Sequence, residues 1–309
     1  MNYVAKDITV LIPTYNRPQQ IKECLQSIRT QTKPPLEVVI VDASEDFASQ
    51  GALEEFGTAA FNIQYIRSRP NKIEQRNYGL RYVKGSLVQL SDDDIVFERD
   101  YFEKLIESIN QLGDPQFGGA IGRILQHRGS FSNRVNQMIG TIFSKCFLLP
   151  SIGDGHIRKS GYTTYVNYDK AIKFERRIGV LNGAACYKRN VFEAFQFDVF
   201  FNGYCYDEDS DLSLSVGLKH NLYYLPRPCF VHNHLRKEKV DPESYYYQMV
   251  YNHYYMFCKY QKPYHLSWVA FWWANLGVFL YVLLFTRSLS ALKGVTKGFK
   301  ALIVLKGEK

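Results

Sequence analysis

Two groups of neighbouring carboxylates are the sequence features best suited to chemistry. The first is the triplet Asp92–Asp94, which follows the apolar run Ser86–Leu90 after one intervening residue. Two unit charges about 4 Å apart repel each other by roughly 4 kcal/mol at an effective dielectric constant near 20. A divalent cation such as Mn²⁺ or Mg²⁺ would offset this repulsion through its own charge. The alternative is an acidic turn whose side chains are solvated.

The spacing within the triplet separates its members. In an extended chain, Asp92 and Asp94 point to one side and Asp93 to the other. A D-x-D arrangement of this kind predicts one carboxylate for the ion and one for a nearby hydroxyl.

The second group is the segment 207–211, "DEDSD", which precedes a helical pattern. A carboxylate here could act as a general base that takes a proton from a hydroxyl. Acidic residues at a helix N-terminus also cap free N–H groups and suit the helix dipole. The residues alone leave both interpretations open.

Elements that would position these carboxylates can be predicted from hydrophobic periodicity. Short β-branched runs alternate with helical patterns at 18–29 and 72–83. This alternation predicts an α/β fold with a mostly parallel sheet and helices on its faces. The predicted strands are Ile8–Pro13, Glu37–Val41, Asn62–Ile66 and Ser86–Leu90.

Ligands of such sheets bind beyond the carboxyl ends of the strands. Thr14, Tyr15 and Asn16 follow the first predicted strand, Asp42 the second and the aspartate triplet the fourth. The first turn, "PTYNRP", has no glycine, which excludes the dinucleotide-binding fingerprint.

Composition restricts the class of partner. The chain has 309 residues and a formal charge of +8, which suits nucleic acid, an anionic membrane surface or a phosphorylated substrate. No nucleic-acid module is present, and nucleic acid is not expected as a partner. Six scattered cysteines without C-x-x-C spacing indicate reduced thiols in the cytoplasm. The N-terminus shows no signal-peptide layout, so the first half of the chain is expected to stay in the cytoplasm.

Five motifs in order resemble those of the inverting family-2 glycosyltransferases, which have the GT-A fold, a Rossmann-like sheet. The resemblance covers about Ile8 to His234, and its segments are "VLIPTYNRP", "VVIVDASED", "EQRNYGL", "LSDDD" and "YDEDSDLSL". It implies a metal-dependent transfer of a sugar from a nucleotide-sugar donor to a hydroxyl, with inversion. One metal site and one base would suffice, in contrast to the two carboxylates of a hydrolase.

The resemblance also implies roles for individual residues. Asp209 would be the catalytic base, with Glu208 beside it. Asp94 would ligate Mn²⁺ or Mg²⁺, with Asp92 and one histidine of the pair His232 and His234 as further candidates. Asn182 and Gly183 would contact the acceptor. The donor would be bound by Pro13, Thr14, Tyr15, Arg17, Asp42, Arg76, Asn77, Asp92 and Asp93, with the Asp42 carboxylate accepting the imide N–H of uracil or thymine.

Two departures from the family pattern concern the acceptor. The chain continues "SLSVGLKH" where many members have an arginine, and Val180 and Leu181 stand where many have a tryptophan. These differences leave the acceptor contacts undecided, whereas the expected donor site is unaffected.

The C-terminal third has a different character. Leu266–Phe285 contains 20 residues without a formal charge, enough to cross a bilayer core of about 30 Å. The basic amphipathic tail that follows suits the interface of an anionic leaflet. Because both flanks are basic, an in-plane or re-entrant attachment is preferred over a single span. A buried helix or an oligomer contact is the structural alternative.

These observations predict a glycosyltransferase at the cytoplasmic face of the cell membrane that uses a UDP- or dTDP-sugar and a glycan or lipid-linked acceptor. The predicted domains are a GT-A domain over 1–239, with an irregular basic insert at 117–178 as a possible acceptor region, and a helical region over 240–309. Within the latter, 245–309 would meet the membrane surface. The alternative is a non-catalytic membrane-recruited scaffold that retains the fold.

Overall fold

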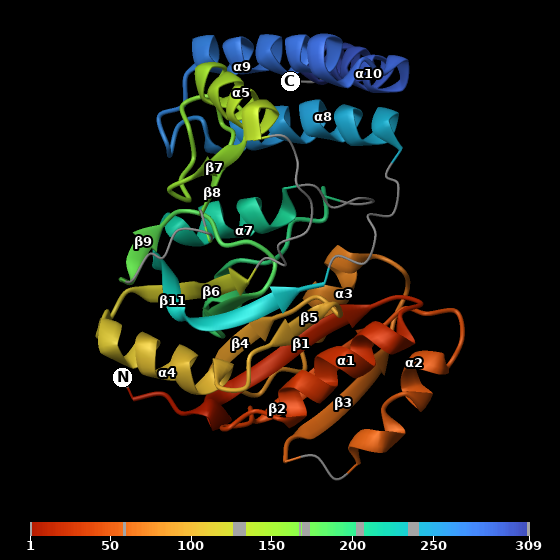
Figure 1. The fold of residues 1–309 in the computed structure, drawn as a ribbon, viewed down its shortest axis with the longest axis vertical. Helices are drawn as coiled ribbons and strands as arrows, with labels where there is room; N and C mark the ends of the chain where they lie inside the picture. The colour runs from red at the N-terminus through yellow and green to blue at the C-terminus, as the bar shows by residue number, and fades with distance from the viewer. Residues whose placement is uncertain are drawn as a thin grey trace. The chain divides into compact units, whose positions relative to one another are not determined.

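The computed structural model describes residues 2–57, 60–125, 134–166, 168, 174–201, 207–233 and 241–307 (Figure 1). The chain forms two compact units. The first contains residues 1–127 and 168–235, and the second contains 128–167 and 236–309. The domain boundary suggested after residue 239 stays a prediction.

Strands of the first unit form one sheet. Among the described residues its order is β3-β2-β1-β4-β10-β6-β11-β5, with β9 paired to β11. The β1–β2, β2–β3, β1–β4 and β6–β11 pairs are parallel, whereas β5, β9 and β10 run antiparallel to their neighbours. The strands are β1 (Ile8–Thr14), β2 (Glu37–Asp42), β3 (Asn62–Arg67), β4 (Leu87–Leu90), β5 (Ile95–Phe97), β6 (Phe117–Leu125), β9 (Arg176–Ile178), β10 (Ala185–Lys188) and β11 (Asn221–His232).

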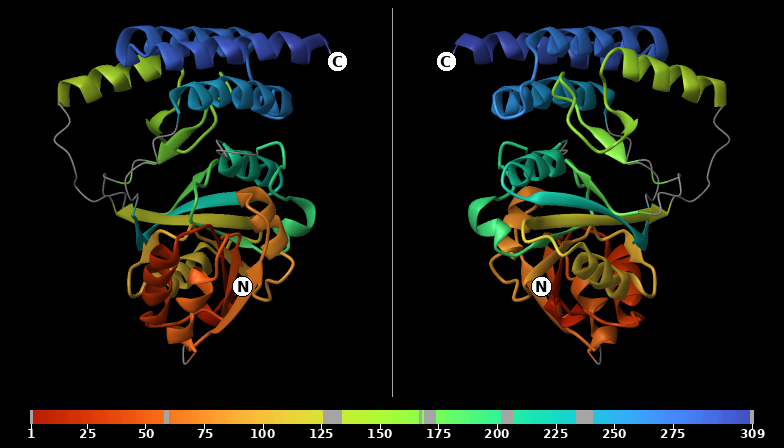
Figure 2. Two further views of the ribbon diagram at one scale, coloured as in Figure 1. Left: turned by 90° about the vertical axis from the view of Figure 1, so that its right-hand side faces the viewer. Right: turned by 90° about the vertical axis from the view of Figure 1, so that its left-hand side faces the viewer.

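Helices cover both faces of this sheet. Figure 2 shows α7 on one face and α1 and α4 on the other. The helix α3 lies against β1 and β2, and α4 against β11. The helices of this unit are α1 (Pro18–Arg29), α2 (Ala48–Gly51), α3 (Lys72–Gly79), α4 (Tyr101–Leu112), α6 (Val191–Ala194) and α7 (Glu208–Gly217), with short 3₁₀ turns at Ala5–Asp7 and Glu54–Phe56.

The predicted α/β fold is confirmed, and its strands begin or end within a residue of prediction. The strands β1 and β2 are buried throughout, as expected for central parallel strands covered on both faces. The helix predicted over 72–83 is shorter and ends at Gly79. Gly79 packs against Leu11 and Val41, and a Cβ atom at this position would force their buried side chains to move.

The second unit is mainly helical. It contains α5 (Arg134–Cys146), α8 (Pro242–Tyr260), α9 (Trp268–Tyr281), a π-helical continuation at Val282–Thr286, α10 (Leu289–Gly307) and a parallel ribbon of β7 (Ser151–Gly153) and β8 (Thr164–Val166). The segment expected to be an irregular insert therefore contains β6 and β9 in the first unit and α5, β7 and β8 in the second.

Aromatic contacts hold the second unit together. Trp273 of α9 stacks on Phe147 at 4.8 Å, and its indole N–H donates to the Cys146 carbonyl at 2.9 Å. In α8, His253 stacks on Tyr162 at 3.6 Å, and its Nε2 lies 2.8 Å from the Ser160 carbonyl. Residues 134–166 thus share a core with the C-terminal helices.

Candidate active site

The aspartate triplet lies just beyond the end of β4, beside the end of β1. Asp93 turns toward β1, where it accepts a hydrogen bond from Thr14 Oγ1 at 2.8 Å and lies 3.2 Å from the Arg17 guanidinium. Burial raises the pKa of Asp93 to about 6, although Thr14 and Arg17 act in the opposite direction. Asp93 therefore supports the loop from within, and the same Arg17 nitrogen lies 3.6 Å from Asp94 Oδ2, so that one guanidinium group bridges these two carboxylates.

Asp92 and Asp94 meet His232 at the end of β11. Antiparallel pairing with β5 places His232 opposite Ile95, the residue after the triplet. One potential ligand atom from each of the three residues lies within 4.8 Å of the others, and His232 Nε2 is 3.0 Å from Asp94 Oδ1. Burial lowers the pKa of His232, but its hydrogen bond to Asp94 and the two carboxylate charges raise it overall.

This trio fits a divalent cation. Carboxylate oxygens suit both Mg²⁺ and Mn²⁺, and imidazole is a common metal ligand in proteins. His232 is the histidine that the fold brings to the carboxylates, whereas His234 lies outside the described residues.

Two cations of α3 connect the aspartate triplet to the second acidic cluster. The Arg76 side chain is fully buried, with guanidinium nitrogens 3.1 Å from Asp92 Oδ1 and 2.9 Å from Asp209 Oδ1. Lys72 Nζ lies 3.1 Å from Asp92 Oδ1 and 3.5 Å from Glu208 Oε1. With Arg17, these cations offset part of the repulsion within the triplet without any metal. Burial raises the pKa of Asp92, but the charges of Lys72 and Arg76 lower it by more. The pKa of Asp92 therefore falls well below its usual range.

Within the second cluster, the neighbours Asp209 and Glu208 differ in their exposure to solvent. The Asp209 side chain is 23% exposed, whereas that of Glu208 is 8% exposed. Asp209 Oδ2 accepts a hydrogen bond from the Gly183 backbone N–H at 2.8 Å, so both of its oxygens have a fixed donor. Burial, together with the charge of Asp209, raises the pKa of Glu208 above its ordinary value. Asp209 is thus better placed to meet a substrate.

The residues expected to bind the nucleotide lie at the carboxyl ends of β1 and β2. Pro13 is buried in β1, and Tyr15 is exposed, with its hydroxyl 3.2 Å from Glu45. The Asp42 carboxylate is completely buried. It accepts hydrogen bonds from Ser44 N–H at 2.7 Å and from the Tyr65 hydroxyl at 2.6 Å. In this arrangement Asp42 stabilises the end of β2, and neither of its oxygens is exposed to a nucleotide base.

Asn77 and Phe197 form a small cover over Arg76. Both polar groups of the Asn77 amide pair with the Phe197 backbone, at 2.8 and 3.0 Å. The Phe197 ring lies 4.9 Å from the Arg76 guanidinium. The sequence analysis missed Lys72 and Phe197, although Lys72 stands one helical turn before Arg76, a spacing that places both side chains on one face.

Residues 9–169, just over half of the chain, match the family described as "Glycosyl transferase family 2". The chain belongs to this family. The resemblance inferred from the five motifs is thereby confirmed. The family-2 match begins within β1 and includes Arg76 and the aspartate triplet, while Asp209 and His232 lie beyond its end.

Curated relatives are glycosyltransferases that match about a third of this family-2 chain. Over 103 residues it is 36% identical to glycosyltransferase GlyA of Streptococcus pneumoniae, covering 33% of this chain and 15% of that protein. Over 106 residues it is 32% identical to an uncharacterized glycosyltransferase of Haemophilus influenzae, covering 34% and 35%. The match thus spans well under half the length of either relative.

Solved structures share the fold at low sequence identity. The mannosyltransferase PcManGT from Pyrobaculum calidifontis, in complex with GDP-Man and Mn²⁺, aligns with a TM-score of 0.56 at 18% identity, covering 97% of this chain and 81% of that one. TarS residues 1–349 from S. aureus, in complex with UDP, aligns with a TM-score of 0.55 at 14% identity, covering 91% and 73%. These likenesses confirm the GT-A fold of this family-2 member.

Proposed function

We propose that this protein transfers a sugar from a UDP- or dTDP-sugar to a hydroxyl of a glycan or lipid-linked acceptor, with inversion and with Mn²⁺ or Mg²⁺ bound. The observation that carries the proposal is the junction made by Arg76. It joins the potential metal ligands Asp92, Asp94 and His232 to the open carboxylate Asp209 within one buried charge network. The site could therefore stabilise a leaving group and deprotonate an attacking hydroxyl at adjacent positions.

A metal held by these ligands would neutralise charge that develops on the departing diphosphate. Lys72 and Arg76 add two positive charges beside that position. The acceptor oxygen attacks the anomeric carbon, the bond from that carbon to the diphosphate breaks, and Asp209 takes the hydroxyl proton. A single displacement inverts the anomeric centre. Gly183 would keep Asp209 oriented, and Asn182 beside it would adjoin the acceptor.

Two solved structures and the surroundings of Asp42 bear on which nucleotide the donor carries. A TarS complex contains UDP-GlcNAc, whereas the PcManGT complex contains GDP-Man. Thr14, Tyr15 and Arg17 stand at the end of β1, where the base and ribose would bind. Since Asp42 is sealed, a base that reached it would have to displace the Tyr65 hydroxyl. The donor panel should therefore include GDP-mannose beside the uridine and thymidine sugars.

We propose a membrane location for the protein on the basis of the second unit. Its helix Trp268–Thr286 is long and apolar enough to cross a bilayer, and only part of it is buried. This supports attachment to a membrane through 245–309, in plane, re-entrant or as one span, and we place that attachment at the cytoplasmic face. The basic residues Lys145, Arg158 and Lys159 of the second unit could meet an acceptor phosphate there.

A nucleotide-sugar panel with Mn²⁺ or Mg²⁺ tests the function by thermal shift. A donor at 100 times its Kd should stabilise the protein by about 2.7 kcal/mol. Asp94→Ala should abolish the metal-dependent part of the shift. Asp100→Ala, which removes only a surface pair with Lys104, is the matched control. A shift that is identical with and without metal would contradict the proposed metal site.

Turnover distinguishes the enzyme from the non-catalytic scaffold. A transferase should hydrolyse its sugar nucleotide slowly in the absence of acceptor, with water in place of the hydroxyl, and only when metal is present. A protein that binds the nucleotide but shows no metal-dependent hydrolysis or transfer would be the scaffold.

A further inference from the structure

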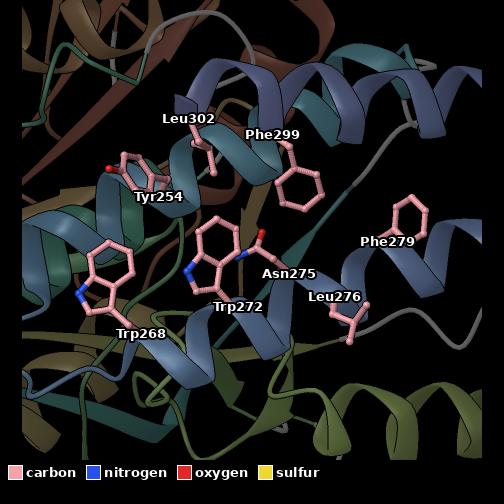
Figure 3. Close-up of a pocket in the computed structure, with 8 residues that line it drawn as sticks. All are labelled: Tyr254, Trp268, Trp272, Asn275, Leu276, Phe279, Phe299 and Leu302. Carbon is pink, nitrogen blue, oxygen red and sulfur yellow. The ribbon is translucent and has the colours of Figure 1, made fainter. Parts of the chain in front are cut away.

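Unpaired hydrogen-bond donors gather on the strands β6, β9 and β11 of the first unit. The groove that Figure 3 shows in the second unit is lined mainly by apolar and aromatic side chains, and these strands carry a feature of the opposite kind. Arg123 Nε, both Nε and Nη2 of Arg176, and the Tyr224 hydroxyl are buried without a hydrogen-bond partner in the part of the chain that the structure describes. Because buried polar atoms are nearly always paired, four unpaired atoms at one place indicate a missing partner.

The three side chains lie on one face of neighbouring strands. Arg176 of β9 is the cross-strand partner of Tyr224 in β11, and Tyr224 is the partner of Ile121 in β6. Arg123 follows Ile121 by two residues in the same strand and therefore faces the same side of the sheet. Neighbouring strands lie about 4.8 Å apart, so both guanidinium groups stand close to the Tyr224 side chain.

The cluster carries positive charge that no described carboxylate neutralises. Neither Arg123 nor Arg176 forms an ion pair or a side-chain hydrogen bond with any residue that the structure describes. Burial raises the pKa of Tyr224 to about 12, although the charges of both arginines lower it, and no carboxylate contributes to this shift. An anion bound here would therefore pair two cations that have no partner of their own.

A ligand can reach the two guanidinium groups from solvent. Both arginines are half-buried, and those of their guanidinium nitrogens that are neither buried nor bonded remain accessible. Tyr224 is fully buried, so its hydroxyl would donate to a ligand that enters between the arginines, or to a water molecule that such a ligand holds.

The chemistry of the donors favours a phosphoryl group. Guanidinium groups bind the oxygens of phosphate and carboxylate in a planar, two-pronged arrangement. A carboxylate offers two oxygens and one charge, whereas a phosphoryl group offers three acceptor oxygens and up to two charges. Two arginines and a phenol hydroxyl match the larger set of acceptors.

The cluster lies on the sheet face that α7 covers, and α7 carries the proposed base Asp209 in its first turn (Figure 2). A Cβ atom added to Gly122 would meet Tyr101 of α4, so Gly122 points to the opposite face. Its neighbour Arg123 therefore points to the face of α7. An acceptor that approaches Asp209 would meet this side of the sheet.

We propose that Arg123, Arg176 and Tyr224 form a binding site for a phosphoryl group of the acceptor. The inference rests on the proposed glycosyl transfer and narrows its acceptor to one that carries phosphate. The site belongs to the first unit and does not depend on the basic residues of the second. The phosphoryl group has two sources, a lipid phosphate and a phosphorylated sugar, which present the same oxygens.

Modification of the full chain by phenylglyoxal, mapped by mass spectrometry, tests the site without requiring activity, because this reagent attacks accessible guanidinium groups. Inorganic phosphate at four times its Kd should slow modification of Arg123 and Arg176 about fivefold. The exposed Arg177, whose charge acts on Asp114 instead, should react at an unchanged rate. Chloride at equal ionic strength controls for screening. Protection should persist with UDP and Mg²⁺ present, since the donor is expected to bind elsewhere.

Two organic probes distinguish the sources of the phosphoryl group. Geranyl phosphate represents a lipid phosphate and glucose 1-phosphate a phosphorylated sugar, and geraniol and glucose are their controls. Protection at lower concentration by one of the two phosphates assigns the acceptor to that class, and equal protection supports recognition of the phosphoryl group alone. Geraniol or glucose that protects as well as its phosphate would overturn the proposal.

A matched pair of hydroxyl deletions separates a ligand site from a structural role. Tyr224→Phe removes an unpaired hydroxyl, so the melting temperature in phosphate-free buffer should not fall. The Kd for phosphate, measured by isothermal titration, should rise about tenfold. Tyr223→Phe removes a hydroxyl that donates to Asp114 at 2.9 Å. That variant should melt at a lower temperature and bind phosphate as the wild type does.

A second matched pair tests the charges. Arg176→Gln should abolish the protection of Arg123 by phosphate, whereas Arg177→Gln should leave it unchanged. Both variants should keep the wild-type thermal shift with UDP and Mn²⁺.

The contrary outcomes are specific. Equal modification of Arg123, Arg176 and Arg177 with and without phosphate would overturn the proposal. A Tyr224→Phe variant that melts at a lower temperature and binds phosphate normally would assign the cluster a structural role and also overturn it. Phosphate protection in a wild-type protein that shows no shift with any nucleotide sugar would refute the proposed function alone.

Discussion

Arg76 is a fully buried cation whose position explains how two acidic clusters coexist. It contacts carboxylates from both clusters, and the Phe197 ring covers its guanidinium group. A buried charge is tolerated only when it is paired, because its transfer from water is costly. The same network places positive charge beside the potential metal ligands.

Replacing Arg76 with lysine should therefore be disruptive despite the retained charge. An ammonium group cannot span Asp92 and Asp209 with fixed, planar geometry. We expect the free energy of unfolding to fall by about 2 kcal/mol and the donor KM to rise. Urea unfolding and donor kinetics measure both effects. Arg227→Lys, in a surface pair with Glu107, is the matched control and should change neither.

Asp209 and Glu208 should differ in their effect on catalysis. Asp209→Asn should lower kcat by about 10³-fold, as expected for loss of a general base, while the Kd for UDP and Mn²⁺ changes little. Glu208→Gln should lower kcat far less, because that side chain is largely hidden. Steady-state kinetics and isothermal titration measure these values. Losses of equal size would remove the distinction between the two residues.

At the scale of elements, the pair α8 and α10 depends on small residues at their contact. Gly294 of α10 packs against the backbone of Glu243, and Gly298 packs against Val250. The four-residue spacing places both glycines on one helix face, so the two helices approach closely. The sequence analysis described this segment only as a basic amphipathic tail.

Gly294→Ala should destabilise the second unit, since the new methyl group would overlap the Glu243 carbonyl. A loss of about 2 kcal/mol is expected from overpacking. Gly140→Ala in α5 is the matched control, because nothing lies within 4 Å of its added methyl group. That substitution should be neutral or stabilise by up to about 1 kcal/mol through helix propensity. Thermal unfolding of both variants measures the difference.

The helix α8 should also make the second unit sensitive to acid. Burial lowers the pKa of His253 to about 3, against the effect of its bond to the Ser160 carbonyl. The unfolded chain takes up a proton near pH 6.5 and the folded chain does not, so stability is full above that pH and declines as the pH falls. The expected loss between pH 7.5 and pH 5 is about 2 kcal/mol.

His253→Gln keeps a donor for the Ser160 carbonyl but has no group that titrates in this range. Its free energy of unfolding should start lower than that of the wild type and should lack this decline. Urea unfolding at pH 7.5, 6 and 5 tests the expectation. A parallel decline in both proteins would mean that other groups set the acid sensitivity.

At the scale of the whole molecule, the proposed chemistry and the proposed membrane attachment belong to different units. The candidate catalytic residues lie in the first unit, while the apolar helix and the lysines of α10 lie in the second. Membrane binding should therefore be separable from donor binding by substitution.

Vesicle sedimentation tests this separation. Changing Lys293, Lys297 and Lys300 to alanine should weaken binding to anionic vesicles about 100-fold, because each lysine contributes about 1 kcal/mol. Binding to neutral vesicles and the nucleotide thermal shift should stay as in the wild type. The control changes three lysines of the first unit to alanine, with the same loss of charge: Lys22, Lys84 and Lys104. Equal weakening by both triple variants would show that only net charge matters.

Hydrophobic periodicity along the sequence was sufficient to predict the fold class and the polar residues that follow each strand. Alternating runs predicted β1 to β4, and Thr14, Asp42 and the aspartate triplet follow the ends of β1, β2 and β4 as expected. Hydrophobic period and chain alternation depend on neighbours in sequence, so a sequence carries them directly. Helix ends were less accurate, as the termination of α3 at Gly79 shows.

Contacts between distant segments were decided by the tertiary structure alone. The pairing of β11 with β5 brings His232 to Asp94, and Arg76 meets Asp209 across more than a hundred residues of chain. The sealing of Asp42 by Tyr65 and the docking of Phe147 on Trp273 are of the same kind. No periodicity encodes such contacts, because they depend on which surfaces pack together once the sheet and helices have formed.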